Sequence, residues 1–352
     1  MLDLLYIGFD GMDPLIVKQK GLFADFCLSV ATAPIAATGP SWTTMNTSLP
    51  PEEHGVYQCH GLKMDIEKDV TYHDSSAFAE LGNIFFWDYL NAAGMTCGLM
   101  NVPITWPPRV IDGWMVSGIP ALDRDRMCYP PEFREYVISD YWMGVLDKIR
   151  NDMSWLPGSP TRTVPGMEDK GLTNKTVLDF LQNKGFPFFM EAQLKMSRDR
   201  LRILHNIMAE HPVNCLFYQD VFLDEFNHIF MYHEDETERM PILYDLAVEI
   251  TAELMEKYPA KTTILVSDHG GRSGRHYPDG VFGIKSDRVR KQGAACQIQD
   301  ILPTTLYLMG IHEPIKQQKL RGRVLYELIE EYNLGASEQE EVKKHLKALG
   351  YI

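Results

Sequence analysis

Short apolar runs that end in polar residues recur along the chain, and helical patterns lie between them. LDLLYIGFD ends at Asp10, FCLSVATAPI ends just before Thr38, and NCLFYQD ends at Asp220. MTCGLMNVP and TTILVSDHGG have the same character, whereas RMPILYDLAVEITAELMEKY (239–258) repeats its apolar residues at helical spacing. Strands that alternate with helices predict an α/β fold with a mostly parallel central sheet and helices on both faces. Ligands of such sheets bind outside the carboxyl ends of the strands, where these polar residues fall.

Residues 104–200 break the alternation. They are rich in Pro, Trp, Met and Gly, and they show only helical fragments until about residue 174. We interpret 104–200 as an irregular, cap-like insertion that shapes the substrate site within one catalytic domain spanning 1–352. The final ASEQEEVKKHLKALGYI predicts a helix, since acidic residues precede the lysines as the helix dipole favours.

The amino-acid composition limits the kinds of molecule that the chain can bind and the compartment in which it is expected. A formal net charge of −14 opposes binding to a nucleic-acid polymer but still allows a small phosphate compound as substrate. We find no apolar run long enough for a membrane span and no signal-peptide pattern at the N-terminus. The six cysteines are scattered without a C-x-x-C pair, which favours a reducing compartment and predicts a cytoplasmic protein. Nothing in the sequence indicates an oligomeric state.

Aspartates and histidines after the expected strands form a candidate metal site. In DEFNH, Asp224 and His228 stand four residues apart, so one helical turn would direct both at the same ion. Asp268 and His269 are adjacent, and on an extended backbone they could reach two centres or straddle one. His276 follows in a glycine-rich loop that can fold back over the site.

Mixed nitrogen and oxygen donors suit zinc, or alternatively manganese, better than calcium or magnesium. Two such ions about 4 Å apart could hold the attacking and leaving oxygens of a phosphoryl displacement. Each residue alone also has a structural explanation, because an Asp after a strand is commonly a cap and an Asp–His pair commonly lies on a solvated helix. Their joint placement at successive strand ends, Asp10 included, favours the metal site.

The ordered motifs resemble those of the type I phosphodiesterase/nucleotide pyrophosphatase family of the alkaline phosphatase superfamily. The similar stretches are IGFDGMDP, TGPSWTTMNTSLPPEEHG, DEFNH, VSDHGG, GRHYPDGVF and QDILPTTLYLMGI, and they span residues 3 to about 311. The resemblance implies an alkaline-phosphatase-like fold and metal-dependent hydrolysis of phosphate esters. It also implies two sets of metal ligands: Asp10, Thr38, Asp268 and His269 for one ion, and Asp224, His228 and His276 for the other.

By the same resemblance, the nucleophile lies in a T/S/C-x-P element, which makes it Thr38 in TGP. Pro40 suits the first turn of a helix, and helix N-terminal amides favour an incoming phosphate. A threonine hydroxyl is a weak nucleophile until metal coordination deprotonates it. Ser41 occupies the position where related nucleotide pyrophosphatases place an Asn that contacts a phosphate oxygen.

Arg272 and Arg275 are further candidates for substrate contact, since arginine matches phosphate geometry. We expect His54 of PEEHG to be structural. His312 is the alternative to His276 as the third histidine, and Asp220 is the alternative to Asp224, although only Asp224 has the D-x-x-x-H spacing.

Several functions share such a site. A phosphomonoesterase, a phosphonate hydrolase, a phosphomutase and a non-catalytic metal-binding homologue stay open, whereas TGPSW lacks the Cys and Arg of a sulfatase element. A nucleotide-binding protein is disfavoured because the chain has neither G-x-G-x-x-G nor a P-loop. Insertion aromatics such as Trp106, Trp114 and Trp155 could accommodate a second ester group, so the sequence favours a phosphodiesterase or nucleotide pyrophosphatase.

Overall fold

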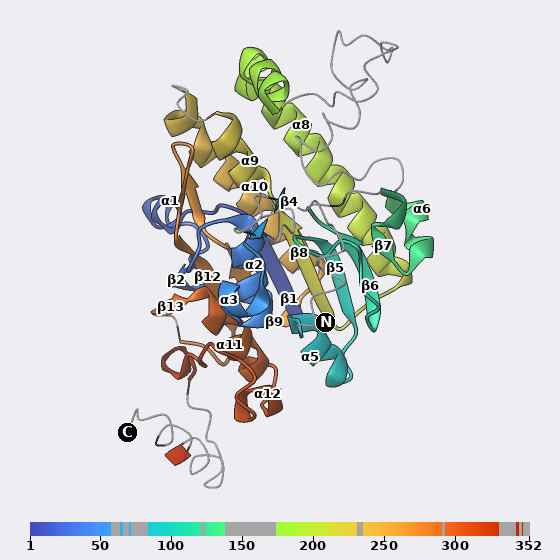
Figure 1. The fold of residues 1–352 in the computed structure, drawn as a ribbon, viewed down its shortest axis with the longest axis vertical. Coiled ribbons are helices and arrows are strands. Elements are labelled where there is room, and N and C mark those ends of the chain that lie inside the picture. Colours follow the sequence, from blue (N-terminus) through green and yellow to red (C-terminus); the bar gives the residue numbers. More distant parts are fainter. Residues whose placement is uncertain are drawn as a thin grey trace.

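The structure is a computed structural model of the chain (Figure 1). It describes residues 1–57, 64–65, 70–71, 84–119, 121, 124–137, 174–230, 235–290, 293–330, 343–344 and 347. Within these residues, none of the helices is both long and apolar enough to cross a membrane.

A nine-stranded central sheet forms from the described residues, in the order β13-β2-β12-β9-β1-β8-β5-β6-β7. Its strands are β1 (Leu2–Phe9), β2 (Cys27–Thr32), β5 (Cys97–Val102), β6 (Gly113–Ser117), β7 (Cys128–Tyr129), β8 (Cys215–Asp220), β9 (Ala260–Val266), β12 (Asp279–Ser286) and β13 (Ala295–Gln297). β1 lies at the centre and pairs in parallel with both β8 and β9, while β12 and β7 run antiparallel to their neighbours. The predicted α/β class with a mostly parallel sheet is confirmed.

Helices cover both faces of the sheet. One face carries α1 (Pro14–Lys20), α6 (Arg134–Val137), α8 (Asn174–Glu210), α9 (Phe222–Ile229) and α10 (Asp235–Lys257). The other carries α2 (Thr38–Thr47), α5 (Phe86–Ala92) and α11 (Ile301–Leu308), with α3 (Pro51–His54) beside α2 and α12 (Glu313–Lys316) beyond α11. In Figure 1, α8, α9 and α10 lie on the opposite side of the sheet strands from α3 and α11. The helix expected over 239–258 corresponds to α10.

Two hydrophobic cores result, one on each face. Along β1, Leu5 and Ile7 point into the core with α8 to α10, and Leu4 and Tyr6 point into the core with α2 and α5. Because successive side chains of a strand alternate between faces, a strand buried on both sides must be apolar throughout. This requirement explains the continuous run LLYIGF.

Shorter elements complete the described chain. They are β3 (Met64–Asp65), β4 (Val70–Thr71), the hairpin strands β10 (Gly270–Arg272) and β11 (Arg275–Tyr277), and the 3-10 turns η1 (Arg124–Arg126), η2 (Pro131–Phe133), η4 (Ile298–Asp300) and η5 (Tyr326–Leu328). Within the expected insertion 104–200, β6 and β7 belong to the central sheet, and α8 begins at Asn174. Residues 138–173 lie outside the described part, so a cap at this place stays a prediction, and all but three residues of the predicted C-terminal helix also lie outside it.

Candidate active site

Three buried carboxylates gather at the carboxyl ends of the three central strands. Asp10 directly follows β1, Asp268 follows β9, and Asp224 lies in the first turn of α9 after β8. The backbone N–H of Gly11 donates to Asp268 Oδ1 at 3.3 Å. Gly11 has a φ of +73°, and a Cβ there would lie 3.0 Å from Asp224 Cβ, so glycine lets β1 turn directly against Asp224.

The crowding of negative charge changes the acidity of these groups. Burial, followed by the charges of Asp268 and Asp224, raises the pKa of Asp10 well above its usual range. Burial and the charge of Asp224 raise the pKa of Asp268 to about 8. Burial also acts to raise the pKa of Asp224, but its contacts with His228 and His276 outweigh this and hold it well below the usual range. The cluster therefore lacks positive charge on the side of Asp10 and Asp268.

His269 points a ring nitrogen at this negative charge. Its side chain is fully buried, with Nε2 lying 3.3 Å from Asp268 Oδ2 and 3.5 Å from Asp10 Oδ1. Nδ1 faces the carbonyl oxygen of Gly270 at 3.2 Å, which places the ring proton on Nδ1 and the lone pair of Nε2 toward the carboxylates. Burial lowers the pKa of His269, so the ring is neutral. A lone pair facing two carboxylates is repulsive unless a cation, either a proton or a metal ion, lies between them.

A second group joins α9 to the β10–β11 hairpin. His228 Nε2 lies 3.2 Å from Asp224 Oδ2, and His276 Nε2 lies 3.0 Å from Asp224 Oδ1 and 2.9 Å from His228 Nε2. His276 Nδ1 faces the carbonyl oxygen of Ala36 at 3.0 Å, which turns Nε2 toward the group. Burial acts to lower the pKa of His276, but the carboxylate of Asp224 raises it to about 9. Two imidazole nitrogens and a carboxylate at these distances require a shared cation, either a proton or a metal ion.

Buried polar atoms that lack a hydrogen-bond partner indicate whether the cluster can hold metal ions. Asp224 Oδ1, Asp268 Oδ2 and His269 Nε2 are buried without a hydrogen-bond partner among the described residues, and the 3.0 Å approach of His276 to Asp224 Oδ1 lacks hydrogen-bond geometry. Leaving such atoms without partners is costly, whereas carboxylate oxygens and imidazole nitrogens are good ligands of divalent ions. Two ligand sets have donor atoms within 4.8 Å of one another: Asp224, His228 and His276, and Asp10, Asp224 and His269. The residues fit divalent metal ions.

Thr38 lies against the first of these carboxylates. It is the first residue of α2, it is 7% exposed, and its hydroxyl donates to Asp10 Oδ1 at 3.3 Å. One turn later, Trp42 Nε1 donates to Asp10 Oδ2 at 3.1 Å. The start of α2 thus brings a hydroxyl to the candidate metal-ligand cluster, where the free N–H groups of a helix N-terminus favour an anion.

Comparison with known proteins identifies the family. A family model described as type I phosphodiesterase / nucleotide pyrophosphatase matches residues 4–345. The chain belongs to this family. It is therefore a hydrolase that acts on phosphoester bonds, and the family's dependence on metal agrees with the candidate ligand groups. The comparison with curated proteins found no significant match.

Solved structures agree with the fold. Ectonucleotide pyrophosphatase/phosphodiesterase 5 of mouse superposes with a TM-score of 0.54 at 11% identity, covering 94% of this chain and 100% of that one. The human protein of the same name gives a TM-score of 0.51 at 11% identity, with 88% and 95% covered. The expected alkaline-phosphatase-like fold is confirmed.

The three side chains that the sequence predicts to contact substrate in this phosphodiesterase-family chain lie in three different environments. Ser41 is fully buried and donates to the carbonyl oxygen of Ile35 at 2.6 Å. The guanidinium of Arg272 pairs with the buried carboxylate of Asp13 and lies over the ring of Tyr277. Arg275 is exposed beside the turn of the hairpin. Of the three, Arg275 has the side chain most open to solvent.

The structure also shows where His54, which we expected to be structural, lies. It does the same for Asp220 and His312, the alternatives to Asp224 and His276. His54 ends α3 and is buried, with its Nδ1 accepting from the N–H of Val56. The carboxylate of Asp220 points into the core, where it pairs with Arg200 and accepts from the hydroxyl of Tyr218 at 3.0 Å. His312 lies at the start of α12. The structure brings Asp224, which the D-x-x-x-H spacing favoured, and His276 close to one another, at 3.0 Å between Asp224 Oδ1 and His276 Nε2.

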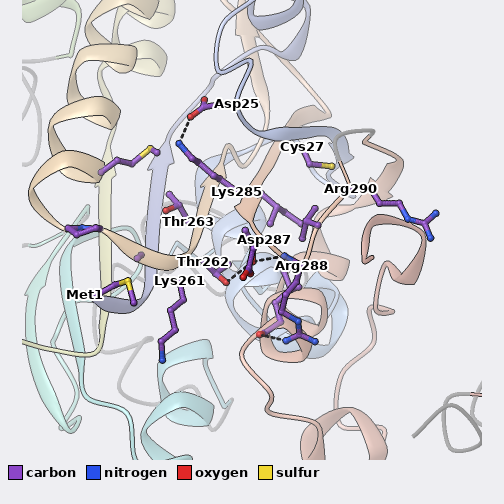
Figure 2. Close-up of a pocket in the computed structure, with 17 residues that line it drawn as sticks. Met1, Asp25, Cys27, Lys261, Thr262, Thr263, Lys285, Asp287, Arg288 and Arg290 are labelled. Carbon is purple, nitrogen blue, oxygen red and sulfur yellow. Dashed lines mark hydrogen bonds and ion pairs between the residues drawn. The ribbon is translucent and has the colours of Figure 1, made fainter. Parts of the chain in front are cut away.

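A cavity of about 870 Å³ lies at the opposite edge of the sheet, where β1 and β9 begin and β12 ends (Figure 2). Its charged side chains are largely engaged, because Lys285 pairs with Asp25 and Lys261 pairs with Asp3. Figure 2 shows Arg290 directed away from the other labelled residues. Because the cluster lies at the carboxyl ends of β1 and β9 and the cavity lies where these strands begin, the length of the strands separates the two.

Proposed function

We propose that this chain is a two-metal phosphodiesterase or nucleotide pyrophosphatase that acts through Thr38. The observation that carries the proposal is the contact of the Thr38 hydroxyl with Asp10 Oδ1, since that oxygen also lies 3.5 Å from His269 Nε2. A nucleophile that shares a carboxylate with a histidine lone pair lies where a bound ion would reach its oxygen.

The ligand assignment is the one that the family resemblance implies, and it divides the cluster between its two ends. Asp10, Thr38, Asp268 and His269 would hold one ion, and Asp224, His228 and His276 would hold the other. Mixed imidazole and carboxylate donors favour zinc, with manganese as the alternative. When bound, the two ions would lower the pKa of the Thr38 hydroxyl and neutralise charge on the attacking and leaving oxygens.

The residues of the protein position the phosphoryl group and accept it during the reaction. Thr38 Oγ1 forms a bond to phosphorus while the bond from phosphorus to the leaving oxygen breaks. The product is a Thr38-linked phosphodiester that keeps the second ester group, and the leaving oxygen takes up the proton that Thr38 releases. Water then cleaves the bond from phosphorus to Thr38 Oγ1, which restores the hydroxyl and releases a phosphate monoester. The backbone N–H groups at the start of α2 stabilise the phosphoryl oxygens in both steps.

A solved relative supports this choice of nucleophile and substrate class. The mouse ectonucleotide pyrophosphatase/phosphodiesterase 5 has been crystallised as an inactive threonine-to-alanine variant in complex with AMP. A nucleotide ester fits a small-phosphate substrate and the net charge of −14, which disfavours nucleic-acid polymers. A phosphomonoesterase or phosphonate hydrolase is the alternative within the same fold.

Three further expectations belong to the proposal. Ser41, Arg272 and Arg275 are candidates for substrate contact, and residues within 104–200 would shape the space for the second ester group. A cytoplasmic location agrees with the buried free thiols of the described cysteines. Replacing Arg275 with Ala should raise KM without lowering kcat, as expected for uniform substrate binding.

The test replaces Thr38 with Ala and measures turnover of bis-p-nitrophenyl phosphate with added zinc or manganese. We expect a loss of at least about 1,000-fold in kcat, partial activity in Thr38→Ser, and the p-nitrophenyl ester of phosphothreonine in acid-quenched parent enzyme. Thr43→Ala is the matched control, because Thr43 lies in the same helix and only donates to the carbonyl oxygen of Gly39. Parental turnover by Thr38→Ala with both ions bound would remove Thr38 from the mechanism.

A further inference from the structure

The hairpin that carries His276 is short. β10 and β11 pair over three residues each, with Gly271 opposite His276, and the turn between them has positive φ at Ser273 (+51°) and Gly274 (+67°). A two-stranded hairpin of this size is marginally stable by itself in water. The position of the His276 ring must therefore be set by contacts from outside the hairpin.

Asn227 supplies such contacts from α9. Its side chain is fully buried, its Oδ1 accepts from the N–H of Gly274 at 2.9 Å, and its Nδ2 faces the carbonyl oxygen of Arg275 at 3.4 Å. The first contact is a normal hydrogen bond and the second a weak one. One amide thus contacts Gly274 in the turn and Arg275 at the start of β11, immediately before His276.

The position of Asn227 in the sequence explains why this residue type suits its two contacts with the hairpin. Asn227 lies between Asp224 and His228 on α9, so the helix that presents two members of the ligand group also holds the third member's hairpin. A Cβ on Gly271 would lie 3.1 Å from Asn227 Nδ2, so glycine allows β10 to approach the amide closely. Of the residue types similar in size to Asn, Asp lacks the donor and Leu lacks both groups.

We propose that Asn227 is a positioning residue that fixes the distance between His276 and the Asp224–His228 pair, and thereby the affinity of that metal position. The inference rests on the proposed two-metal function. It assigns Asn227 no contact with substrate or metal. Groups that orient metal ligands commonly change metal affinity by about 10- to 100-fold when removed.

The experiment measures zinc binding and turnover by full-length Asn227→Ala at controlled free zinc. We expect about 10-fold or greater weakening at one of two zinc positions and recovery of turnover when zinc is raised, because every ligand is still present. His276→Ala should lose the same position and should not recover. Asn206→Ala, an exposed Asn on α8, should behave as the parent.

The outcomes separate the two claims. If the parent holds fewer than two ions, or His276→Ala binds zinc as the parent does, the ligand assignment fails. If His276→Ala loses one ion while Asn227→Ala keeps parental affinity, the positioning role is overturned. Should Asn227→Ala not fold, Asn227→Leu decides, because Leu is similar in size and loses both the acceptor for Gly274 and the donor for Arg275; parental zinc affinity in Asn227→Leu would then overturn the role.

Discussion

The indole N–H of Trp42 donates to Asp10 Oδ2 at 3.1 Å, which connects the second turn of α2 to the first carboxylate of the cluster. The other oxygen of Asp10 accepts from Thr38, so one helix contacts both oxygens of this carboxylate. Trp42 is 1% exposed, and a Cβ on Gly8 would lie 2.4 Å from its ring. Trp42 therefore orients Asp10 and packs α2 against β1 at the same time.

Replacing Trp42 with Phe should weaken metal binding and lower kcat/KM by about 10-fold, because Asp10 loses a hydrogen bond that favours its charged form. Packing is partly retained, so we expect a loss of only about 1–2 kcal/mol in the free energy of unfolding. Zinc titration and steady-state kinetics on the same samples measure the first effect, and urea unfolding measures the second.

Trp114→Phe is the control for that variant. Trp114 is equally buried, and its indole N–H donates to the carbonyl oxygen of His211, remote from the cluster. It should lose comparable stability while keeping parental zinc affinity. If both variants weakened zinc binding to the same degree, the orienting role of Trp42 would be refuted.

The strand ends were predictable because apolar runs and the polar residues that follow them are local features. The runs ending at Asp10 and Asp220 correspond to β1 and β8, and the four-residue spacing of Asp224 and His228 does bring their side chains within 3.2 Å. The order of strands in the sheet is not local. β12 was not predicted, since its sequence DGVFGIKS contains two glycines and no clear alternation, and its antiparallel direction has no local signal.

The residues that support the cluster were also not predicted. Trp42 and Asn227 read as ordinary helix residues, and their roles depend on partners that only the folded chain brings near. The pairing of Arg272 with Asp13 spans 259 positions, so no local feature of the sequence could show that this candidate phosphate contact lies against a buried carboxylate. Within the cluster, the sequence predicts that the aspartates and histidines gather, because their residue types and their positions after the strands indicate metal binding directly.

His54 should make stability depend on pH. Burial lowers its pKa to about 4 from an ordinary value of 6.5, and its Nδ1 accepts from the N–H of Val56 while Nε2 lies 3.0 Å from Thr44 Oγ1. Between pH 6.5 and 4 the unfolded chain binds the proton and the folded chain does not, so stability falls as the pH falls. The contribution is at most about 3 kcal/mol across this window.

Urea unfolding of the parent and of His54→Gln at pH 7 and pH 4.5 measures this contribution. Other groups also titrate, so the informative quantity is the difference between the two proteins. His54→Gln should be less stable at pH 7, by about 1 kcal/mol, and should lose less stability on acidification. Equal losses in the two proteins would mean that His54 does not contribute to the acid sensitivity.

The ion pair between Arg200 and Asp220 is fully buried, with neither side chain exposed to solvent. It joins α8 to the end of β8, and Asp220 also accepts from the N–H of Asp10 through its backbone oxygen at 2.9 Å. Arg200→Met should destabilise the protein by about 3–5 kcal/mol, because it leaves the carboxylate of Asp220 buried without its counter-ion. The double variant Arg200→Met/Asp220→Asn should recover part of that loss, since it removes the uncompensated charge.

Equilibrium urea unfolding of both variants tests the ion pair, with Arg202→Met as the control on the same helix. Arg202 is half exposed and pairs with Asp199 at 3.4 Å, so its loss should change the free energy of unfolding by no more than about 0.5 kcal/mol. A double variant less stable than Arg200→Met alone would show that polar contacts of Asp220, and not its charge, dominate. In that case the hydrogen bond from Ser197 to the Asp220 carboxylate would be the main connection between α8 and the strand end.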